Sequence, residues 1–252
     1  MTDFSTLPLS PALQPGLDAL GYTTLTPIQA QSLPAILDGR DVIAQAPTGS
    51  GKTAAFGLGL LQSIDPSLIR VQALVLCPTR ELADQVGKQI RKLATGIPNL
   101  KLLVLTGGMP LGPQLASLEA HDPQVVVGTP GRIQELGRKR VLHLGGVTTL
   151  VLDEADRMLD MGFEEPIREI AGRTSKDRQT LLFSATYPDE IREIARVLLR
   201  DPVEVTVQGA DNAPAIRHLF CEVDLASKQK ALAGLLLKYN PESTVVFCNT
   251  RR

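Results

Sequence analysis

Short apolar runs alternate along the chain with longer segments in which apolar residues recur every three or four positions. The longer segments have helical periodicity, while the short runs, rich in leucine and β-branched residues, are typical of strands buried on both faces. This alternation favours an α/β fold, doubly wound, with a mostly parallel sheet flanked by helices. Seven predicted strands cover 41–46, 71–77, 101–106, 124–128, 148–153, 179–184 and 203–207.

A polar, turn-rich stretch follows the seventh strand and divides the chain. Residues 208–216 contain glycine, proline, aspartate and asparagine, which is typical of a linker. We therefore expect a first domain over 1–207 and the incomplete start of a second domain over 217–252. The second piece is too short to bury a core of its own. Its pattern predicts a βαβ unit, with strand, helix and strand at 218–223, 227–239 and 244–248.

Composition and charge exclude several classes of protein. The 252-residue chain is 43% hydrophobic and 21% charged, which excludes disordered, collagen-like and disulfide-framework proteins. Its net charge of −1 means that any nucleic acid must be bound by local basic clusters. We find no leader pattern and no apolar run long enough to cross a bilayer, which predicts a cytoplasmic protein without membrane contact. We expect buried, unpaired thiols at Cys77, Cys221 and Cys248.

A phosphate-binding loop follows the first predicted strand. In such a loop, glycines let backbone N–H groups approach phosphate oxygens, a lysine reaches the β- and γ-phosphates, and the last hydroxyl can ligate Mg²⁺. A glycine-rich turn without a ligand is the alternative, but it does not explain a Gly-Lys-Thr triplet directly after a strand. The predicted ATP-binding residues of this loop are Ala46, Thr48, Gly49, Ser50, Gly51, Lys52 and Thr53.

An acidic segment supplies the partner that this loop needs. The fifth predicted strand ends at Asp153, which can hold Mg²⁺, usually through water, and Glu154 can orient or deprotonate the water that attacks the γ-phosphate. Alone, Asp-Glu-Ala-Asp is equally a solvated first helical turn, and the phosphate loop favours the catalytic interpretation. We predict Lys52, Asp153 and Glu154 as catalytic residues, Thr53 and Asp153 as magnesium ligands, and ATP with Mg²⁺ as cofactors.

These motifs resemble those of the DEAD-box RNA helicases, and further motifs of that family follow in order. Each is weak alone, whereas the ordered set is specific and covers essentially the whole chain. They are Thr-Pro-Ile-Gln at 26–29, Pro-Thr-Arg-Glu-Leu at 78–82, Gly-Gly at 107–108, Thr-Pro-Gly-Arg at 129–132, Ser-Ala-Thr at 184–186 and Val-Val-Phe-Cys-Asn-Thr at 245–250.

The resemblance implies a RecA-like P-loop NTPase and an RNA-stimulated ATPase that separates short RNA duplexes or remodels RNA–protein complexes. The stretches 56–61 and 72–77 look most like a bacterial branch whose C-terminal RNA-binding domain directs it to large-subunit ribosomal RNA. This implies ribosome assembly as the setting, with ribosomal RNA as the partner of the complete protein. The sequence leaves the oligomeric state open and favours a monomer.

The resemblance also assigns adenine recognition to residues 4–29. In it, Gln29 accepts from adenine N6–H and donates to N7, a pattern that guanine cannot satisfy. Tyr22 packs against the adenine, and Phe4 takes the place of the family's upstream aromatic residue. From the residues alone, Thr26 and Gln29 form a helix-capping box that needs no nucleotide, and this alternative stays open.

The loops after three further strands are where the family binds the RNA backbone. Arginine, threonine and backbone N–H groups at strand ends suit phosphate oxygens, and the glycines permit close approach, so we expect little sequence preference. The threonines could instead be ordinary helix caps. The residues concerned are Pro78, Thr79, Arg80, Gly107, Gly108, Thr129, Gly131 and Arg132.

A last motif links the two ligands. In the family, Ser184 and Thr186 bond to the acidic motif, here Asp156, and couple nucleotide state to RNA strand separation. Hydrogen bonds that merely end the strand are the alternative. The family's arginine fingers would lie beyond Arg252, so we expect this stretch of chain to bind ATP weakly and hydrolyse it poorly. A non-enzymatic, nucleotide-gated RNA- or protein-binding module and a DNA-directed helicase are the competing hypotheses.

Overall fold

The computed structural model describes residues 3–120, 122–208 and 219–248. The chain divides into two compact units, Met1–Ala210 and Asp211–Arg252, and each is described by itself. Within the described ranges, no helix combines the length and the apolar character that a membrane span requires.

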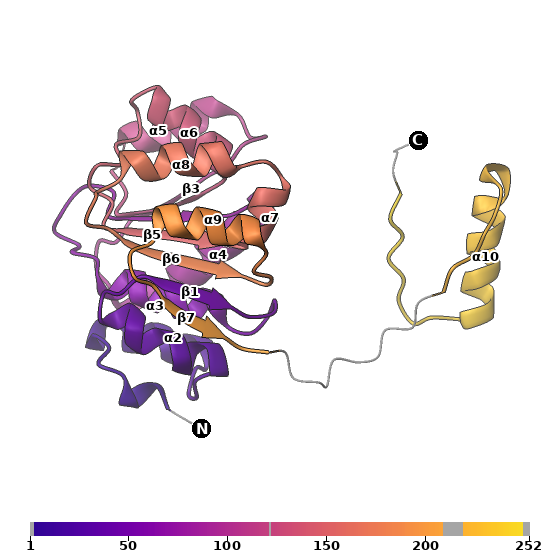
Figure 1. Ribbon diagram of the computed structural model, residues 1–252, viewed down its shortest axis with the longest axis horizontal. Helices are drawn as coiled ribbons and strands as arrows, with labels where there is room; N and C mark the ends of the chain where they lie inside the picture. Colours follow the sequence, from indigo (N-terminus) through magenta and orange to yellow (C-terminus); the bar gives the residue numbers. More distant parts are fainter. Residues whose placement is uncertain (1–2, 121, 209–218, 249–252) are drawn as a thin grey trace. The chain divides into compact units, whose positions relative to one another are not determined.

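A seven-stranded sheet with only parallel pairing forms the centre of the first unit (Figure 1). Its strands lie in the order β3-β4-β2-β5-β6-β1-β7. All seven predicted strands are confirmed. Their bounds are β1 Val42–Gln45, β2 Ala73–Leu76, β3 Leu102–Leu105, β4 Val125–Gly128, β5 Thr149–Asp153, β6 Gln179–Ser184 and β7 Val203–Thr206.

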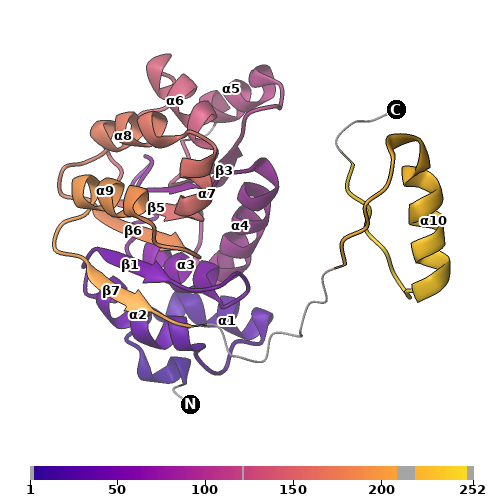
Figure 2. The same ribbon diagram turned by 45° about the vertical axis from the view of Figure 1, so that its right-hand side comes forward.

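Helices cover both faces of this sheet, as Figure 2 shows. Successive strand residues point to opposite faces, so Val42 and Ala44 pack into one core while Ile43 packs into the other. The first core includes α1 Gln14–Leu20, α2 Pro27–Leu37, α3 Lys52–Gln62 and α4 Arg80–Leu93. The second includes α5 Leu111–Ala120, α6 Pro130–Arg138, α7 Ala155–Asp160, α8 Glu164–Arg173 and α9 Asp189–Leu198. Short 3₁₀ helices lie at η1 Phe4–Thr6, η2 Pro11–Leu13, η3 Ala94–Gly96 and η4 Leu225–Ser227.

The parallel arrangement brings the carboxyl ends of all seven strands to one edge of the sheet, the right-hand edge in Figure 1. This is the edge at which open α/β sheets bind ligands. Strand β6 lies between β5 and β1, so the strand that precedes the phosphate loop and the strand that ends in Asp153 flank a common neighbour.

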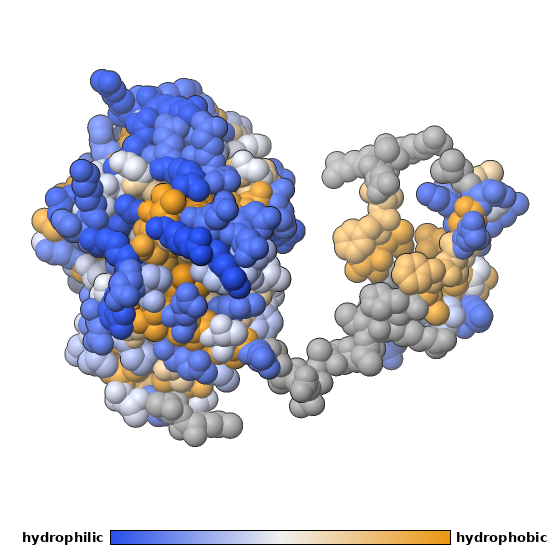
Figure 3. Space-filling model, viewed as in Figure 1, coloured by the Kyte–Doolittle hydropathy of each residue, from blue (hydrophilic) through white to orange (hydrophobic). Residues whose placement is uncertain are grey.

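The second unit differs from its prediction. Helix α10, Lys228–Tyr239, is present, but the flanking runs at 219–223 and 244–248 carry no strand assignment. A strand needs paired neighbours and a packed face, and the described part of this unit offers neither. Its apolar side chains are accordingly on the surface, with Phe220 95% and Phe247 94% exposed (Figure 3).

The cysteine prediction is correct for one residue only. Cys77 is buried in the sheet, whereas Cys221 and Cys248 are exposed because the second unit has no core to bury them. Burial raises the pKa of the Cys77 thiol well above its usual value, so it is an inert apolar side chain. Most of the predicted linker, 209–216, lies outside the described residues.

Candidate active site

The phosphate loop joins β1 to α3 and is held in a shape that only glycine permits at two positions. Gly49 and Gly51 have φ angles of 81° and 96°, in the left-handed region that other residues rarely adopt. A Cβ atom on Gly51 would also lie 2.5 Å from Nε2 of Gln29. Lys52 begins α3 and is buried, and its Nζ donates to the Ala46 carbonyl oxygen at 2.6 Å. The loop is therefore closed on itself by its own lysine.

Two hydroxyls in and beside this loop have no partner within the described part of the chain. Ser50 Oγ is buried and forms no hydrogen bond there, while the buried Thr26 Oγ1 faces the Gln29 N–H of the capping box without a hydrogen bond of normal geometry. A buried polar group left without a partner destabilises the fold by about 1–3 kcal/mol. Phosphate oxygens would accept from the serine hydroxyl, so these residues fit a nucleotide phosphate group.

Asp153 and Lys52 form a buried pair of opposite charge at the same edge. Asp153 is 3% exposed, and burial raises its pKa to about 7, against the opposing effect of the Lys52 charge. Burial also lowers the pKa of Lys52, although the carboxylates of Asp153 and Glu154 act against this. Burial thus disfavours the charged forms of both Lys52 and Asp153. A phosphate group beside Lys52 and a metal cation beside Asp153 would favour the charged forms again.

The side chains at this edge fit Mg²⁺ together with a nucleotide. No group of three or more His, Cys, Asp or Glu residues that could hold a metal occurs in the described ranges. Mg²⁺ does not need such a group, because it keeps several waters and takes one or two protein oxygens plus substrate phosphates. Asp153 and Thr53 supply oxygen ligands of this kind, and Thr53 lies in the first turn of α3, one residue after Lys52.

Glu154 has an unusual backbone. Its φ and ψ angles are both 53°, a left-handed conformation in a residue that is not glycine. Such conformations persist only where the surrounding structure enforces them, and they concentrate at functional sites. The residue forms the turn between β5 and α7, and its carboxylate pairs with Arg157 Nη1 at 3.5 Å. The turn thereby holds the Glu154 side chain beside Asp153 at the strand end.

Direct hydrogen bonds connect Asp156 to the Ser-Ala-Thr motif. Its Oδ2 accepts from the Thr186 backbone N–H at 2.9 Å and from Thr186 Oγ1 at 2.8 Å, while the Asp156 N–H donates to Ser184 Oγ at 3.2 Å. Burial acts to raise the pKa of Asp156, but the hydrogen bonds from Thr186 hold that pKa below its usual value. The Ser184 carbonyl oxygen also accepts from the Ala46 N–H at 3.0 Å. One motif therefore contacts both the acidic segment and the phosphate loop.

The glutamine of the adenine segment contacts the phosphate loop directly. Gln29 Oε1 accepts from the Thr26 N–H at 2.9 Å, and Nε2 donates to the Gly51 carbonyl oxygen at 3.1 Å. The first bond belongs to the capping box that the sequence left open as an alternative, and the second joins α2 to the loop. Phe4 is buried, and its ring stacks on Tyr22 with the centroids 6.1 Å apart.

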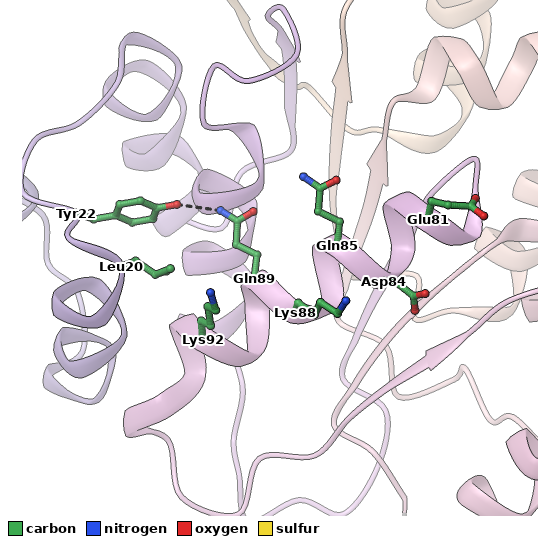
Figure 4. Close-up of a pocket in the computed structure, with 8 residues that line it drawn as sticks. All are labelled: Leu20, Tyr22, Glu81, Asp84, Gln85, Lys88, Gln89 and Lys92. Atoms are coloured by element: carbon green, nitrogen blue, oxygen red, sulfur yellow. Dashed lines mark hydrogen bonds between the residues drawn. The ribbon is translucent and has the colours of Figure 1, made fainter. Parts of the chain in front are cut away.

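Tyr22 also has a partner that the sequence did not indicate. Its hydroxyl accepts from Gln89 Nε2 of α4 at 3.0 Å, and the two residues line a groove of about 650 Å³ along that helix (Figure 4). No local signal marks this contact, because the two residues are 67 positions apart in the chain. The tyrosine is thus oriented by α4 as well as by Phe4.

The loops after β2 and β3 contain one predicted RNA-binding residue that caps a helix, Thr79, and one whose side chain is half-exposed, Arg80. Thr79 caps α4 by accepting from the Leu82 N–H at 3.2 Å, so it does have the structural role considered as an alternative. Arg80 is half-exposed and pairs with the exposed Glu81 at 2.8 Å. Gly108 has a φ of 75° and lies beside the Arg80 guanidinium. An RNA phosphate could reach Arg80 across this glycine.

Arg132 faces inward instead of toward solvent. Its Nη2 donates to the Met109 carbonyl oxygen at 2.9 Å, and its Nε lies 3.2 Å from Glu135 Oε2. The side chain is 9% exposed, and Nη1 is buried without a partner in the part of the chain that the structure describes. Thr129 is used similarly, since its Oγ1 accepts from the Gly107 N–H at 3.0 Å. These two residues tie the loops after β3 and β4 together. The i, i+3 spacing of Arg132 and Glu135 was the available signal for this arrangement.

Comparisons with known proteins identify the family of this chain. A family model described as DEAD/DEAH box helicase matches residues 26–194. The ATP-dependent RNA helicase DbpA of Escherichia coli K12 is 53% identical to this chain, covering 100% of it and 55% of that protein. The DEAD-box ATP-dependent RNA helicase CshA of Bacillus cereus is 43% identical and covers 100% and 48%. This chain spans about half the length of these curated relatives.

A solved structure shares the fold as well. The crystal structure of a DEAD box protein from the hyperthermophile Methanococcus jannaschii is similar to this chain with a TM-score of 0.79 and 37% identity, covering 94% of this chain and 63% of the other. The 53% identity to DbpA is consistent with the bacterial branch that the sequence indicated.

Proposed function

Since the chain belongs to the DEAD-box helicase family, we propose that it is the catalytic part of an ATP-dependent RNA helicase. In this proposal ATP and Mg²⁺ bind between the phosphate loop and Asp153, RNA binds along the loops after β2, β3 and β4, and RNA stimulates hydrolysis. The complete protein separates short RNA duplexes or remodels RNA–protein complexes. Lys52, Asp153 and Glu154 act as the catalytic residues.

The observation that carries the proposal is the arrangement around β6. The strands that bear the phosphate loop and Asp153 flank β6, and Ser184 at its end bonds to Ala46 on one side and to Asp156 on the other. A change at the γ-phosphate can therefore reach Asp156 and Thr186 through direct contacts. All three predicted catalytic residues, Lys52, Asp153 and Glu154, are present. A non-enzymatic binding module would not require all of them, so their presence favours hydrolysis.

Each residue has a defined task in the proposed reaction. Lys52 would leave the Ala46 carbonyl oxygen for the β- and γ-phosphates, and the N–H groups of the loop would bind their oxygens. Bound Mg²⁺, held by Asp153 and Thr53, would neutralise the charge that develops on the phosphates. Glu154 is held at the strand end by its left-handed backbone, where its carboxylate can orient the attacking water and take its proton. Gln29 uses one acceptor site of Oε1 and one N–H of Nε2 in its present hydrogen bonds, which leaves one of each for adenine.

The domain boundaries and the biological setting belong to the same proposal. We assign 1–207 to an ATP-binding domain with the adenine segment at 4–29, residues 208–216 to a linker, and 217–252 to the beginning of a second domain. We further propose a cytoplasmic role in ribosome assembly, with ribosomal RNA as the partner of the complete protein, as the sequence resemblance implies. A monomer that contacts the sugar-phosphate backbone of the RNA suits this role.

A single-turnover assay of ATP hydrolysis by the complete protein tests the proposal, with single-stranded RNA, single-stranded DNA or neither added. We expect Mg²⁺-dependent ATP binding and stimulation by RNA alone. In Glu154→Gln, hydrolysis should fall at least about a hundredfold because the general base is lost, while ATP affinity stays within about threefold. Glu193→Gln, an exposed residue of α9, is the matched control and should leave both unchanged. Equal stimulation by DNA, or no Mg²⁺-dependent affinity for ATP, would overturn the assignment.

A further inference from the structure

The edge of the sheet opposite the active site contains a basic hollow of about 610 Å³. Its walls are the segment before β2, the segment between α6 and β5, and the end of α8, all of which lie at the amino ends of strands. Arg70, Arg140, His143 and Arg173 line it, and no carboxylate does. None of these residues belongs to the motifs described above, so the hollow is separate from the proposed nucleotide and RNA sites.

Two of the three arginines are available for a ligand. Neither Arg70 nor Arg140 forms an ion pair or donates a side-chain hydrogen bond to any residue in the described ranges, and both are exposed. Arg173 is already engaged, because Nη1 donates to the Gly137 carbonyl oxygen at 3.2 Å and Nη2 pairs with Glu169 at 2.9 Å. Two free guanidinium groups thus face a cavity whose lining has no acid to neutralise them.

The segment that forms one wall is fixed by the core. Leu142 and Leu144 are buried in the second core, which leaves His143 between them on the surface. The Val147 N–H donates to the Leu144 carbonyl oxygen at 3.0 Å and closes the turn. The four backbone N–H groups of residues 143–146 donate to no acceptor in the described part of the chain. The wall therefore offers hydrogen-bond donors at fixed positions.

The positions of the two free arginines are set by their neighbours. A Cβ atom on Gly146 would lie 3.1 Å from Arg70 Cδ and 3.0 Å from the Val71 carbonyl oxygen, so the glycine allows the Arg70 side chain to cross it closely. Arg140 has a φ of 58°, a left-handed conformation that is unfavourable for arginine. This conformation belongs to the end of α6, where the Arg140 N–H donates to the Gly137 carbonyl oxygen at 3.1 Å and the Val141 N–H donates to the Leu136 carbonyl oxygen at 3.2 Å. The helix end therefore fixes the backbone of Arg140 beside the hollow.

We propose that this hollow binds the phosphate backbone of an RNA strand. Guanidinium groups and backbone N–H groups are the donors that bind phosphate oxygens most effectively. The cations come from three separate segments around a space larger than one phosphate, which suits successive phosphates of a strand. The inference rests on the proposed function, since RNA is the substrate there, and it adds a second contact at the opposite edge of the sheet. A small phosphate-bearing molecule has the same chemistry, and the test separates the two.

The experiment measures the binding of a fluorescein-labelled single-stranded 20-nucleotide RNA by anisotropy at several salt concentrations. In Arg70→Glu with Arg140→Glu, we expect affinity to fall on the order of tenfold. The slope of log K against log salt should flatten by about 1.4, because two phosphate contacts on a single strand account for about 0.7 each. Lys88→Glu with Lys92→Glu makes the same charge change on exposed lysines of α4 and should weaken binding less than about twofold.

The remaining arms distinguish the outcomes. Arg70→Ala with Arg140→Gly removes the charges without reversing them, relieves the backbone at residue 140 and should lose affinity in the same direction. Far-UV circular dichroism checks that each variant is folded. If wild type binds RNA and the Arg70 and Arg140 variants bind it equally, or if both charge-reversed pairs lose the same affinity, the hollow is not an RNA site.

Inorganic pyrophosphate serves as the small-molecule probe. At 1 mM it should leave RNA binding unchanged, and displacement that disappears in the Arg70 and Arg140 variants would overturn the proposal in favour of a small phosphate ligand. Failure of the proposed function has a different signature, because wild type itself would then bind no RNA or show no Mg²⁺-dependent affinity for ATP.

Discussion

The two halves of the active edge differ in how their charged and polar side chains are satisfied. At the ends of β1, β5 and β6, Lys52 and Asp153 are buried with their pKa values shifted toward the neutral forms, and the Ser50 hydroxyl has no partner in the described part of the chain. At the ends of β2, β3 and β4, Thr79 caps α4 and Arg132 Nη2 donates to the Met109 carbonyl oxygen, while Nε and Nη1 of the same guanidinium form no hydrogen bond in the described part of the chain.

The comparison teaches which half depends on its ligand. Buried charges and unpaired hydroxyls destabilise the empty protein, so a nucleotide that satisfies them should add stability beyond that of an ordinary surface ligand. In the RNA loops, Thr79, Thr129 and Arg132 Nη2 hold the backbone through hydrogen bonds, and the unpartnered nitrogens of Arg132 are the exception. Substitutions should accordingly change stability in different directions in the two halves.

The largest expected effect is the pH dependence of stability at Asp153. Between its ordinary pKa of 3.8 and about 7, the folded chain keeps a proton on Asp153 that the unfolded chain has lost, so stability falls as the pH rises through this window. Asparagine cannot titrate. The free energy of unfolding of Asp153→Asn, relative to wild type, should therefore rise by about 1.4 kcal/mol per pH unit between about pH 4.5 and 6.5. If the free energies of unfolding of wild type and Asp153→Asn, measured by urea titration, change in parallel with pH, Asp153 does not titrate in this window and the prediction is wrong.

Removing Arg132 should have the next largest effect, and with the usual sign. Arg132→Ala removes the hydrogen bond to the Met109 carbonyl oxygen and should lower the free energy of unfolding by about 1 kcal/mol. The urea midpoint of the variant measures this. Arg138→Ala, on the same helix but with a half-exposed side chain, is the control and should lose less. A loss no greater than that of the control would mean that the buried guanidinium does not hold the loops together.

Arg80 should give the smallest change in stability and thereby sharpen the comparison. Its ion pair with Glu81 is exposed on both sides, so Arg80→Ala should leave the urea midpoint unchanged within error. The same variant should bind RNA several-fold more weakly, with a salt slope flatter by about 0.7 for one lost phosphate contact. A destabilised variant with unchanged RNA affinity would reverse the roles assigned to the two arginines.

The sequence predicted the sheet well because the inner strands β2, β4, β5 and β6 are buried on both faces, so their apolar runs need no tertiary information. The phosphate loop was predictable for a related reason, since its glycines and lysine act within eight consecutive residues. The strands of the second unit were not, because a strand exists only with a neighbour. Arg132 was expected at the RNA surface, and its inward orientation depends on Met109, which is 23 positions away. Long-range partners of this kind leave no periodic trace in a sequence.

Ser184 ends the strand that lies between the phosphate loop and the acidic segment, and it bonds to both. The two walls of the nucleotide site are therefore thermodynamically coupled through a single residue. The only side-chain group in these two contacts is the Ser184 hydroxyl, so Ser184→Ala removes the contact with the acidic segment while it keeps the contact with Ala46. A double-mutant cycle of Ser184→Ala with Lys52→Ala would give an interaction energy that measures the coupling between the two walls.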